Sequence, residues 1–345
     1  MVIVHSLTVT NTRSHEEYGI LFSKDTTVIT GTNGTGKTTL LEAIYVALRG
    51  TSFKGTDTDI LRHDSPWWKI EITLENERRI ITYDPSRPFS KKQFIIDNKK
   101  TARLSKKDKY PIVLFEPEDL RVLTGSPQRR RQFIDSLINH VDPFYTHHLR
   151  TYEKALRQRN NLLKSPYCSP EQLFSWDILI AEHGAAIITA RTAYIERLNI
   201  ELTKTYQYIA NSHDECEITY SYTGANTKER LLRELHTNTQ HDIRTGSTSV
   251  GPHRHDIHVF LNGRPISSVG SRGENRTALL ALKFIEVDIV EETTGKKPII
   301  LLDDVFSELD EMRQEKLKTK LHNYQILITS THNYKNTEEQ HITLL

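Results

Sequence analysis

The alternation of apolar and polar residues predicts strands and one buried helix in the first third of the chain. Residues 68–74 alternate regularly, as expected of a strand that buries one face. Thr26–Thr30 is a β-branched run, which packs well on a sheet, and a glycine-rich loop follows it. The helix expected after that loop carries apolar residues on most of its surface, so we expect it to be buried. Further strand-like runs lie at residues 2–4, 20–22, 79–83, 94–96 and 111–115.

The middle of the chain has a helical pattern instead. Between residues 126 and 212 apolar side chains recur at spacings of three and four, and Pro166 and Pro170 separate two helical blocks. Later runs predict strands at 216–222, 257–261, 298–302 and 325–330, and a helix at 276–290. We therefore predict an α/β domain built from residues 1–116 plus 214–345, with a mainly α-helical domain inserted at 117–213.

Composition narrows the class of protein. The 345 residues suit two domains, and no stretch reaches the roughly 18 uncharged apolar residues that a membrane span needs. We find no signal peptide at the N-terminus, and we predict no membrane partner. Two cysteines exclude both a disulfide scaffold and a four-cysteine zinc site, and they suit a reducing cytosol.

The charge is uneven along the chain. The formal net charge is only +2, yet residues 87–109 carry nine Lys and Arg against two Asp. Such a patch can contact a phosphate backbone, or it can simply be solvated.

The glycine-rich loop carries the clearest chemistry. Residues 31–38 match G-x-x-x-x-G-K-[ST], between a predicted strand and a predicted helix. In this motif backbone N–H groups surround phosphate oxygens, Lys37 reaches the β- and γ-phosphates, and the Thr38 hydroxyl binds Mg²⁺. We predict ATP and Mg²⁺ as cofactors. The expected nucleotide-binding residues here are Gly31, Thr32, Asn33, Gly34, Thr35, Gly36, Lys37, Thr38 and Thr39.

Two carboxylates follow the apolar run at 298–302. A buried strand cannot keep a charge inside, so Asp303 should emerge at its C-terminal end, where α/β folds bind ligands. We assign Asp303 to the magnesium ion, through water, and Asp304 to the orientation of the attacking water.

The order of these motifs resembles that of the ABC/SMC-type ATPases. Gly270-Ser271-Arg272-Gly273-Glu274 stands 32 residues before the double acid, at the expected start of a helix, and Ser307-Glu308-Leu309-Asp310 follows it. The resemblance implies a P-loop ATPase head of ABC/SMC type, in which two subunits enclose two nucleotides. Ser271, Arg272 and Gly273 of one subunit would then face the γ-phosphate held by the other, with Ser271 acting in trans.

Within that superfamily the chain is similar to the RecF family of bacterial recombination mediators. The resemblance covers residues 2 to about 331 and rests on segments that general P-loop proteins lack. Among them are 33–38 with 41–45, 52–54, 115–120, 125–135, 156–164 and Val250-Gly251-Pro252-His253-Arg254. It implies a weak, regulatory ATPase that dimerises on ATP and binds DNA at gaps or junctions in the bacterial cytoplasm, associated with the nucleoid. The implied partners are RecR, with or without RecO, and indirectly RecA.

The chain departs from the family pattern at several positions. Gly270 and Glu274 stand where leucine and glutamine are usual, and Glu274 adds a negative charge near the expected triphosphate. This departure bears on dimerisation more than on ATP binding. Lys54 replaces the usual arginine, and His255 interrupts an acidic pair.

DNA contacts are predicted from charge. The candidates are Lys91, Lys92, Lys99 and Lys100 in the basic patch, and Arg129 and Arg130. Arginines at a helix start oppose the helix dipole unless they meet an anion, so we expect one or more of Arg129–Arg131 to contact DNA or a partner acid.

Other functions receive less support. The alternatives are an ABC-type ATP-binding subunit and an SMC-like ATPase without direct DNA binding. The helical insert is too short, and too broken by proline, for a long coiled-coil arm. His253 and His255 share a strand face, but no further ligands complete a metal site there.

Overall fold

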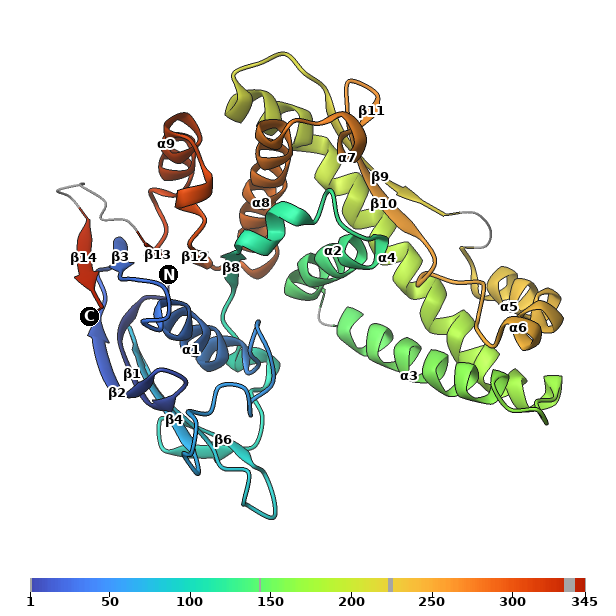
Figure 1. The fold of residues 1–345 in the computed structure, drawn as a ribbon, viewed down its shortest axis with the longest axis horizontal. Coiled ribbons are helices and arrows are strands. Elements are labelled where there is room, and N and C mark those ends of the chain that lie inside the picture. The colour runs from blue at the N-terminus through green and yellow to red at the C-terminus, as the bar shows by residue number, and fades with distance from the viewer. Residues whose placement is uncertain (1, 143, 223–225, 332–338, 345) are drawn as a thin grey trace. The chain divides into compact units, whose positions relative to one another are not determined.

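The computed structural model describes residues 2–142, 144–222, 226–331 and 339–344 (Figure 1). The chain forms two compact units: the first comprises residues 1–119 and 286–345, and the second comprises residues 120–285. Sequence patterns placed the end of the inserted part at residue 213. The second unit extends further because β9 (Cys216–Ser221) and α5 (Lys228–Thr237) both pack against α4 (Pro170–Ala210).

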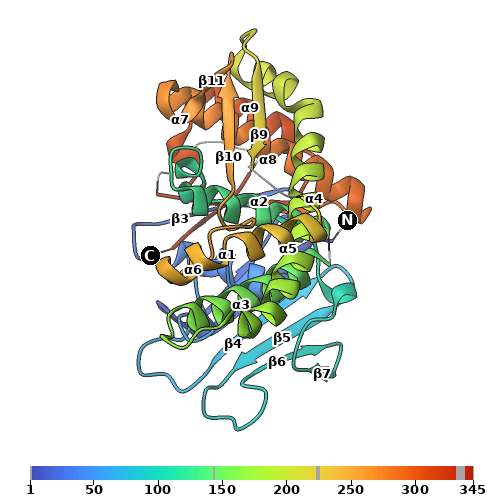
Figure 2. The same cartoon turned by 90° about the vertical axis from the view of Figure 1, so that its right-hand side faces the viewer.

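Two sheets make up the first unit. A parallel sheet has the order β14-β3-β13-β12-β8. Its strands are β3 (Thr26–Thr30), β8 (Ile112–Phe115), β12 (Ile299–Asp303), β13 (Ile326–Ser330) and β14 (Gln340–Thr343). An antiparallel sheet has the order β2-β1-β4-β5-β6-β7, and Figure 2 shows its β4 to β7 side by side. Its strands are β1 (Val4–Thr12), β2 (His15–Leu21), β4 (Trp68–Leu74), β5 (Arg78–Tyr83), β6 (Lys92–Ile96) and β7 (Lys99–Thr101).

The helix α1 (Lys37–Arg49) packs against strands of both sheets, which explains why it is apolar on most of its surface. Leu40, Leu41 and Ile44 share one core cluster with residues of the antiparallel sheet and with Ile299 and Leu301 of β12. The burial expected for this helix is confirmed. Short 3₁₀ turns lie at Lys106–Asp108, Pro117–Arg121 and Phe306–Glu308, and α9 (Glu311–Leu321) precedes β13.

Helices dominate the second unit. They are α2 (Pro127–Val141), α3 (Tyr145–Leu163), α4, α5, α6 (Thr239–Thr245), α7 (Ile266–Val269) and the start of α8 (Arg272–Thr294). A small antiparallel sheet joins β9, β10 (Asp256–Leu261) and β11 (Arg264–Pro265). The helical character expected for residues 126–212 is confirmed, whereas α5, α6 and α9 were not expected.

The helix α4 is long and apolar enough, by length and composition, to cross a membrane. No such segment was expected from the sequence. Its apolar residues have another explanation in this fold, because α3, α5 and β9 all pack against it. Ile180, Ile187, Leu198 and Leu202 are fully or almost fully buried within this fold.

Buried ion pairs hold the second unit together. The Arg159 guanidinium on α3 donates to Asp177 on α4 at 2.5 Å and to Asp242 on α6 at 2.7 Å. It also donates to the Thr248 hydroxyl at 2.9 Å. Burial raises the pKa of Asp177, and the charge of Arg159 opposes that shift. One arginine therefore connects three helical segments at a site without solvent.

Replacing Arg159 with Met would leave two buried carboxylates without their counter-charge. We expect the free energy of unfolding to fall by about 3 to 5 kcal/mol, the usual cost of breaking a buried ion pair from one side. Urea unfolding followed by circular dichroism measures this. The matched control is Arg157→Met, an exposed arginine of the same helix. Equal stability of the two variants would show that the ion pairs do not hold α3 in place.

Candidate nucleotide-binding site

The glycine-rich loop adopts a conformation that depends on glycine. Gly34 and Gly36 both have φ near +89°, in the left-handed region, and Gly36 caps the N-terminus of α1. Gly36 also lies tightly against the turn between β1 and β2. A Cβ atom at this position would lie 2.2 Å from His15 Nε2 and 2.6 Å from Ser14 Oγ, whereas one on Gly34 would meet nothing within 4 Å.

The Lys37 side chain is buried within the loop. Its Nζ donates to the carbonyl oxygens of Gly31 at 2.9 Å and Thr32 at 3.0 Å. These two bonds place the ammonium group where the loop carries its backbone donors, at the positive end of α1. The cation and the helix terminus therefore point to one anion-binding region.

The hydroxyl of Thr38 contacts the end of β12. Its Oγ1 donates to Asp303 Oδ1 at 2.7 Å, and Thr329 Oγ1 donates to the same oxygen at 2.8 Å. Asp303 is almost fully buried, and it pairs in register with Thr329 of β13. Lys54 Nζ lies 3.7 Å from its other oxygen, Oδ2. The two motifs predicted from sequence, 265 positions apart, therefore meet in space.

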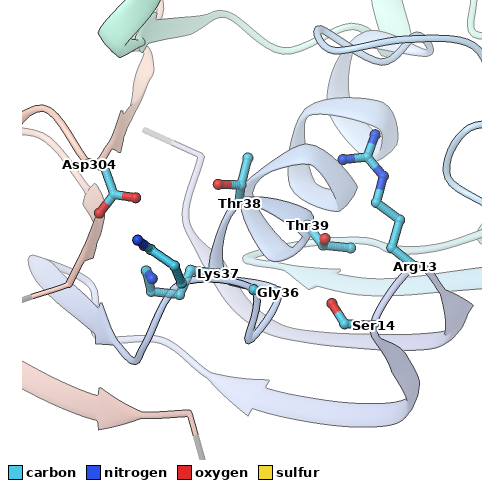
Figure 3. A pocket seen from close by; sticks show the side chains of 9 residues that line it. Arg13, Ser14, Gly36, Lys37, Thr38, Thr39 and Asp304 are labelled. Atoms are coloured by element: carbon cyan, nitrogen blue, oxygen red, sulfur yellow. The ribbon is translucent and has the colours of Figure 1, made fainter.

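Asp304 follows directly, with φ near +52°. Its backbone N–H donates to the carbonyl and hydroxyl oxygens of Thr329, at 3.2 and 3.0 Å. Figure 3 shows its carboxylate facing the Lys37 side chain across the site. The positive φ turns the chain sharply after β12, which separates Asp303 at the strand end from Asp304 on the pocket wall.

These groups surround a cavity of about 250 Å³ (Figure 3). Residues from the loop, the start of α1 and the end of β12 were expected in its lining. Arg13 and Ser14, in the turn between β1 and β2, were not. Its lining is Arg13, Ser14, Asn33, Gly34, Gly36, Lys37, Thr38, Thr39 and Asp304.

Glu42 on α1 is a buried carboxylate that supports two sides of this site. Arg13 Nη2 lies 3.0 Å from its Oε1 and 2.9 Å from its Oε2, and the Ser52 hydroxyl donates to it. Ser52 Oγ in turn accepts the backbone N–H groups of Lys54 and Gly55, both at 2.9 Å. Burial raises the pKa of Glu42, opposed by the Ser52 hydrogen bond and the Arg13 charge. Glu42 thus holds both Arg13 and the turn that carries Lys54.

The segment at residues 270–274 lies in the second unit, at the start of α8. Ser271 and Glu274 form a reciprocal pair there. The Ser271 N–H donates to Glu274 Oε2 at 2.6 Å, and the Glu274 N–H donates to Ser271 Oγ at 3.2 Å. Arg272 is exposed, and Gly273 belongs to the first turn of the helix.

The predicted DNA-contact residues differ in their surroundings. Lys91, Lys99, Lys100 and Arg129 are exposed. Lys92 instead donates to Asp57 at 2.5 Å and to the Gly50 carbonyl at 2.8 Å. Arg130 forms a bidentate pair with Asp256, at 2.9 and 2.6 Å. Arg130 therefore pairs with an acidic residue of its own chain. Because Lys92 and Arg130 are both paired in this way, they are not part of the candidate DNA interface.

His253 and His255 are also accounted for within the fold. His253 Nδ1 shares a hydrogen bond with the Tyr152 hydroxyl at 2.5 Å, and His255 Nδ1 shares one with Tyr220 at 2.7 Å. Burial lowers the pKa of each histidine to about 4. In the described part of the chain, no three His, Cys, Asp or Glu residues are grouped to hold a metal ion.

Comparison with known proteins places this site in a family. Residues 3–343 match the family described as RecF/RecN/SMC N terminal domain. The DNA replication and repair protein RecF of Lachnoclostridium phytofermentans is 34% identical over 336 residues, covering 96% of this chain and 93% of that protein. The protein of the same name from Clostridium perfringens is 33% identical over 335 residues, covering 95% and 92%. The chain belongs to the RecF family.

Solved structures agree with this assignment. A structure of the recombination mediator protein RecF with ATPrS, in the RecFOR pathway, matches with a TM-score of 0.89 at 30% identity, covering 100% of this chain and 96% of that one. The Smc head domain of Pyrococcus furiosus, at a TM-score of 0.52 and 15% identity over 96% and 90% of the two chains, shares the fold. The predicted fold class, an SMC-type P-loop ATPase head, is confirmed.

The residues of this RecF-family site fit a magnesium-bound nucleoside triphosphate. Lys37 and the start of α1 supply positive charge for phosphate, and the donors at Thr38 and Asp303 are oxygens, which Mg²⁺ prefers. Lys54 offers a point charge beside Asp303, 3.7 Å from its Oδ2.

Gly36 provides a sharp test of the loop geometry. In Gly36→Ala the new Cβ would clash with the side chains of His15 and Ser14. We therefore expect the Kd for ATP to rise by at least about tenfold. Gly34 has the same positive φ, but a Cβ added there would meet no neighbouring atom. Gly34→Ala therefore costs only the backbone strain, about 1 kcal/mol. Fluorescent-nucleotide titration compares the two variants. Equal losses would mean that the approach of the β1–β2 turn does not shape the site.

Proposed function

We propose that the chain is an ATP-dependent recombination mediator that closes into a homodimer on ATP and binds DNA at gaps or junctions. There it would act with RecR, with or without RecO, to help load RecA in the bacterial cytoplasm. The ATP-binding part of this proposal rests on the hydrogen bond between Thr38 and Asp303, which brings the two ATP motifs together. The mediator role is supported by RecF relatives that match over nearly their whole length.

The roles of the residues follow from their positions. Lys37 would neutralise the β- and γ-phosphates, and Thr38 and Asp303 would hold Mg²⁺, which supplies charge stabilisation of the phosphates when bound. Asp304 faces Lys37 across the cavity, where it could accept a proton from an attacking water. Ser271, Arg272 and Gly273 would act in trans on the nucleotide of a partner subunit.

We propose slow, regulatory hydrolysis rather than metabolic turnover. Several of the groups needed for nucleotide already make internal hydrogen bonds. Lys37 bonds loop carbonyls, and the Ser271 N–H bonds Glu274. Contacts to nucleotide would replace these bonds, so binding energy goes into rearrangement, as in a switch.

The proposed DNA interface is the basic edge of the antiparallel sheet. Lys99 and Lys100 lie on β7, the outermost strand, and Lys91 directly precedes β6. All three lysines are exposed, as are Arg103 and Lys107 nearby. An edge strand with this charge resists pairing with other strands and can lie against a phosphate backbone. Arg129, exposed in the second unit, is a further candidate.

DNA binding should respond to both nucleotide and charge. We expect the wild-type protein to bind gapped DNA more tightly with ATP than with ADP, and Lys37→Met to lose that difference. The Lys99→Glu/Lys100→Glu variant should weaken binding on every DNA. The salt slope should fall by about 0.9 for each lost duplex-phosphate contact. Fluorescence anisotropy against salt, on gapped, duplex and single-stranded DNA, measures these effects.

The matched control for the charge change is Lys204→Glu, on an exposed position of α4. If the control and the double variant have equal slopes, the basic edge is only a solvated surface. If the wild-type protein binds no DNA in any nucleotide state, the direct DNA-binding role is wrong. An SMC-like ATPase that acts through partners then becomes the better account.

A further inference from the structure

The loop between β5 and β6 presents an aromatic ring to solvent. The side chain of Phe89 is 84% exposed, and among the described residues its ring makes no aromatic or cation–π contact. A phenylalanine ring is large and apolar, so contact with a partner that covers it is favourable. Phe89 therefore has most of its apolar area left to bury against a ligand.

The base of this loop is held by hydrogen bonds. The Asp84 backbone N–H donates to the Lys91 carbonyl at 2.9 Å, which closes the hairpin. Asp84 Oδ1 accepts the Ser86 backbone N–H at 2.9 Å and the Ser86 hydroxyl at 2.6 Å. Arg87 Nη1 donates to Thr82 Oγ1 on β5 at 3.1 Å. The exposed ring thus stands on an ordered base, which lowers the entropy cost of binding through it.

A second aromatic side chain borders the same end of the sheet. Trp68 of β4 pairs with Tyr83 of β5, and Tyr83 pairs with Lys92 of β6, three strands that lie side by side (Figure 2). Trp67 and Lys91 each stand one residue beyond this row, at the end where the loop begins. Trp67 is 39% exposed, whereas Trp68 is buried and stacks on Tyr83. Consecutive strand residues face opposite sides of a sheet, which explains why only one of the two indoles is in the core.

The charge around Phe89 selects the kind of partner. Lys91, Lys99 and Lys100 are exposed, and none of them makes an ion pair with another described residue. Lys99 pairs with Ile96 at the end of β6, and Lys91 precedes its start, so the length of β6, about 16 Å, separates them. An apolar protein segment over the ring would leave these ammonium groups without a counter-charge. A DNA strand supplies both a flat base and phosphates, the combination that single-strand binding proteins recognise with aromatic and basic side chains.

We propose that Phe89 stacks on an unpaired base of single-stranded DNA while Lys91 contacts an adjacent phosphate, so that this loop distinguishes gapped from fully paired DNA. The inference rests on the proposed function and deepens it, because there the basic edge contacts phosphates of either form of DNA. In a duplex each base face is already stacked on its neighbours, and a ring at the tip of a loop finds none free. Phe89 therefore adds affinity only where a base is unpaired.

Four variants separate the aromatic face from other contributions. Phe89→Ala removes the ring, Phe89→Leu keeps an apolar side chain without an aromatic face, and Phe89→Trp keeps an aromatic face. Tyr167→Ala is the matched control, because it removes a ring that is 87% exposed in the second unit. Thermal unfolding should be alike in all four, because none of the altered side chains is buried.

The decisive measurement is the Kd for gapped, single-stranded and duplex DNA, by fluorescence anisotropy with Mg²⁺ and ATP. We expect Phe89→Ala and Phe89→Leu to raise the Kd for gapped and single-stranded DNA about tenfold and to leave that for duplex unchanged. Phe89→Trp and Tyr167→Ala should bind as the wild-type protein does. The salt slope should stay the same in Phe89→Ala, whereas Lys91→Gln should lower it by about 0.7 on single-stranded DNA.

The outcomes separate this inference from the proposed function. If the wild-type protein binds gapped DNA and Phe89→Ala binds it equally well, the stacking proposal is wrong and the DNA-binding role stands. An equal loss on duplex DNA, or a Phe89→Leu protein that binds like the wild type, also overturns stacking on an unpaired base. If the wild-type protein binds none of the three DNAs, the proposed DNA-binding role is wrong, and this inference fails with it.

Discussion

The hydrogen bond from Thr38 to Asp303 is the contact on which the nucleotide site depends. It joins a residue near the start of the chain to one 265 positions later, and the intervening sequence includes the whole second unit. The order of the parallel sheet makes this possible, because β13 lies between β3 and β12 and pairs in register with both. Thr329 of β13 then fixes the Asp303 carboxylate from the side. The two ends of the chain must fold together before this site exists.

Much of the site was predictable because its signals are local. The loop at 31–38, the β-branched strand before it and the apolar strand ending at Asp303 are each readable from a few neighbouring residues. The family resemblance added the order of the motifs. Arg13, Ser14 and Glu42 could not be assigned to the site in this way. Arg13 and Ser14 reach the pocket through the β1–β2 turn, where Arg13 takes a positive φ, as does Asn11 near the end of β1, without a glycine to mark the turn.

The sequence was less informative where long-range partners decide the role of a residue. The sequence around Lys92 and Arg130 does not show that these cations are paired. In the fold Lys92 pairs with Asp57, and Arg130 pairs with Asp256. The extent of the second unit depends on how β9 packs against α4, which a helical pattern ending near residue 213 does not reveal. The capping box at Ser271 and Glu274 is different, since its S-x-x-E spacing is local and present in the sequence.

The central claim is that Thr38 and Asp303 form a magnesium-linked nucleotide site, and the most direct test is how ATP affinity depends on Mg²⁺. Calorimetric titration with and without Mg²⁺ would compare the wild-type protein, Thr38→Val and Thr39→Val, whose altered residue is the adjacent threonine on α1 and does not bond Asp303 in this structure. The account predicts that Mg²⁺ strengthens ATP binding to the wild-type and Thr39→Val proteins and has little effect on Thr38→Val. An equal gain from Mg²⁺ in all three proteins would contradict it.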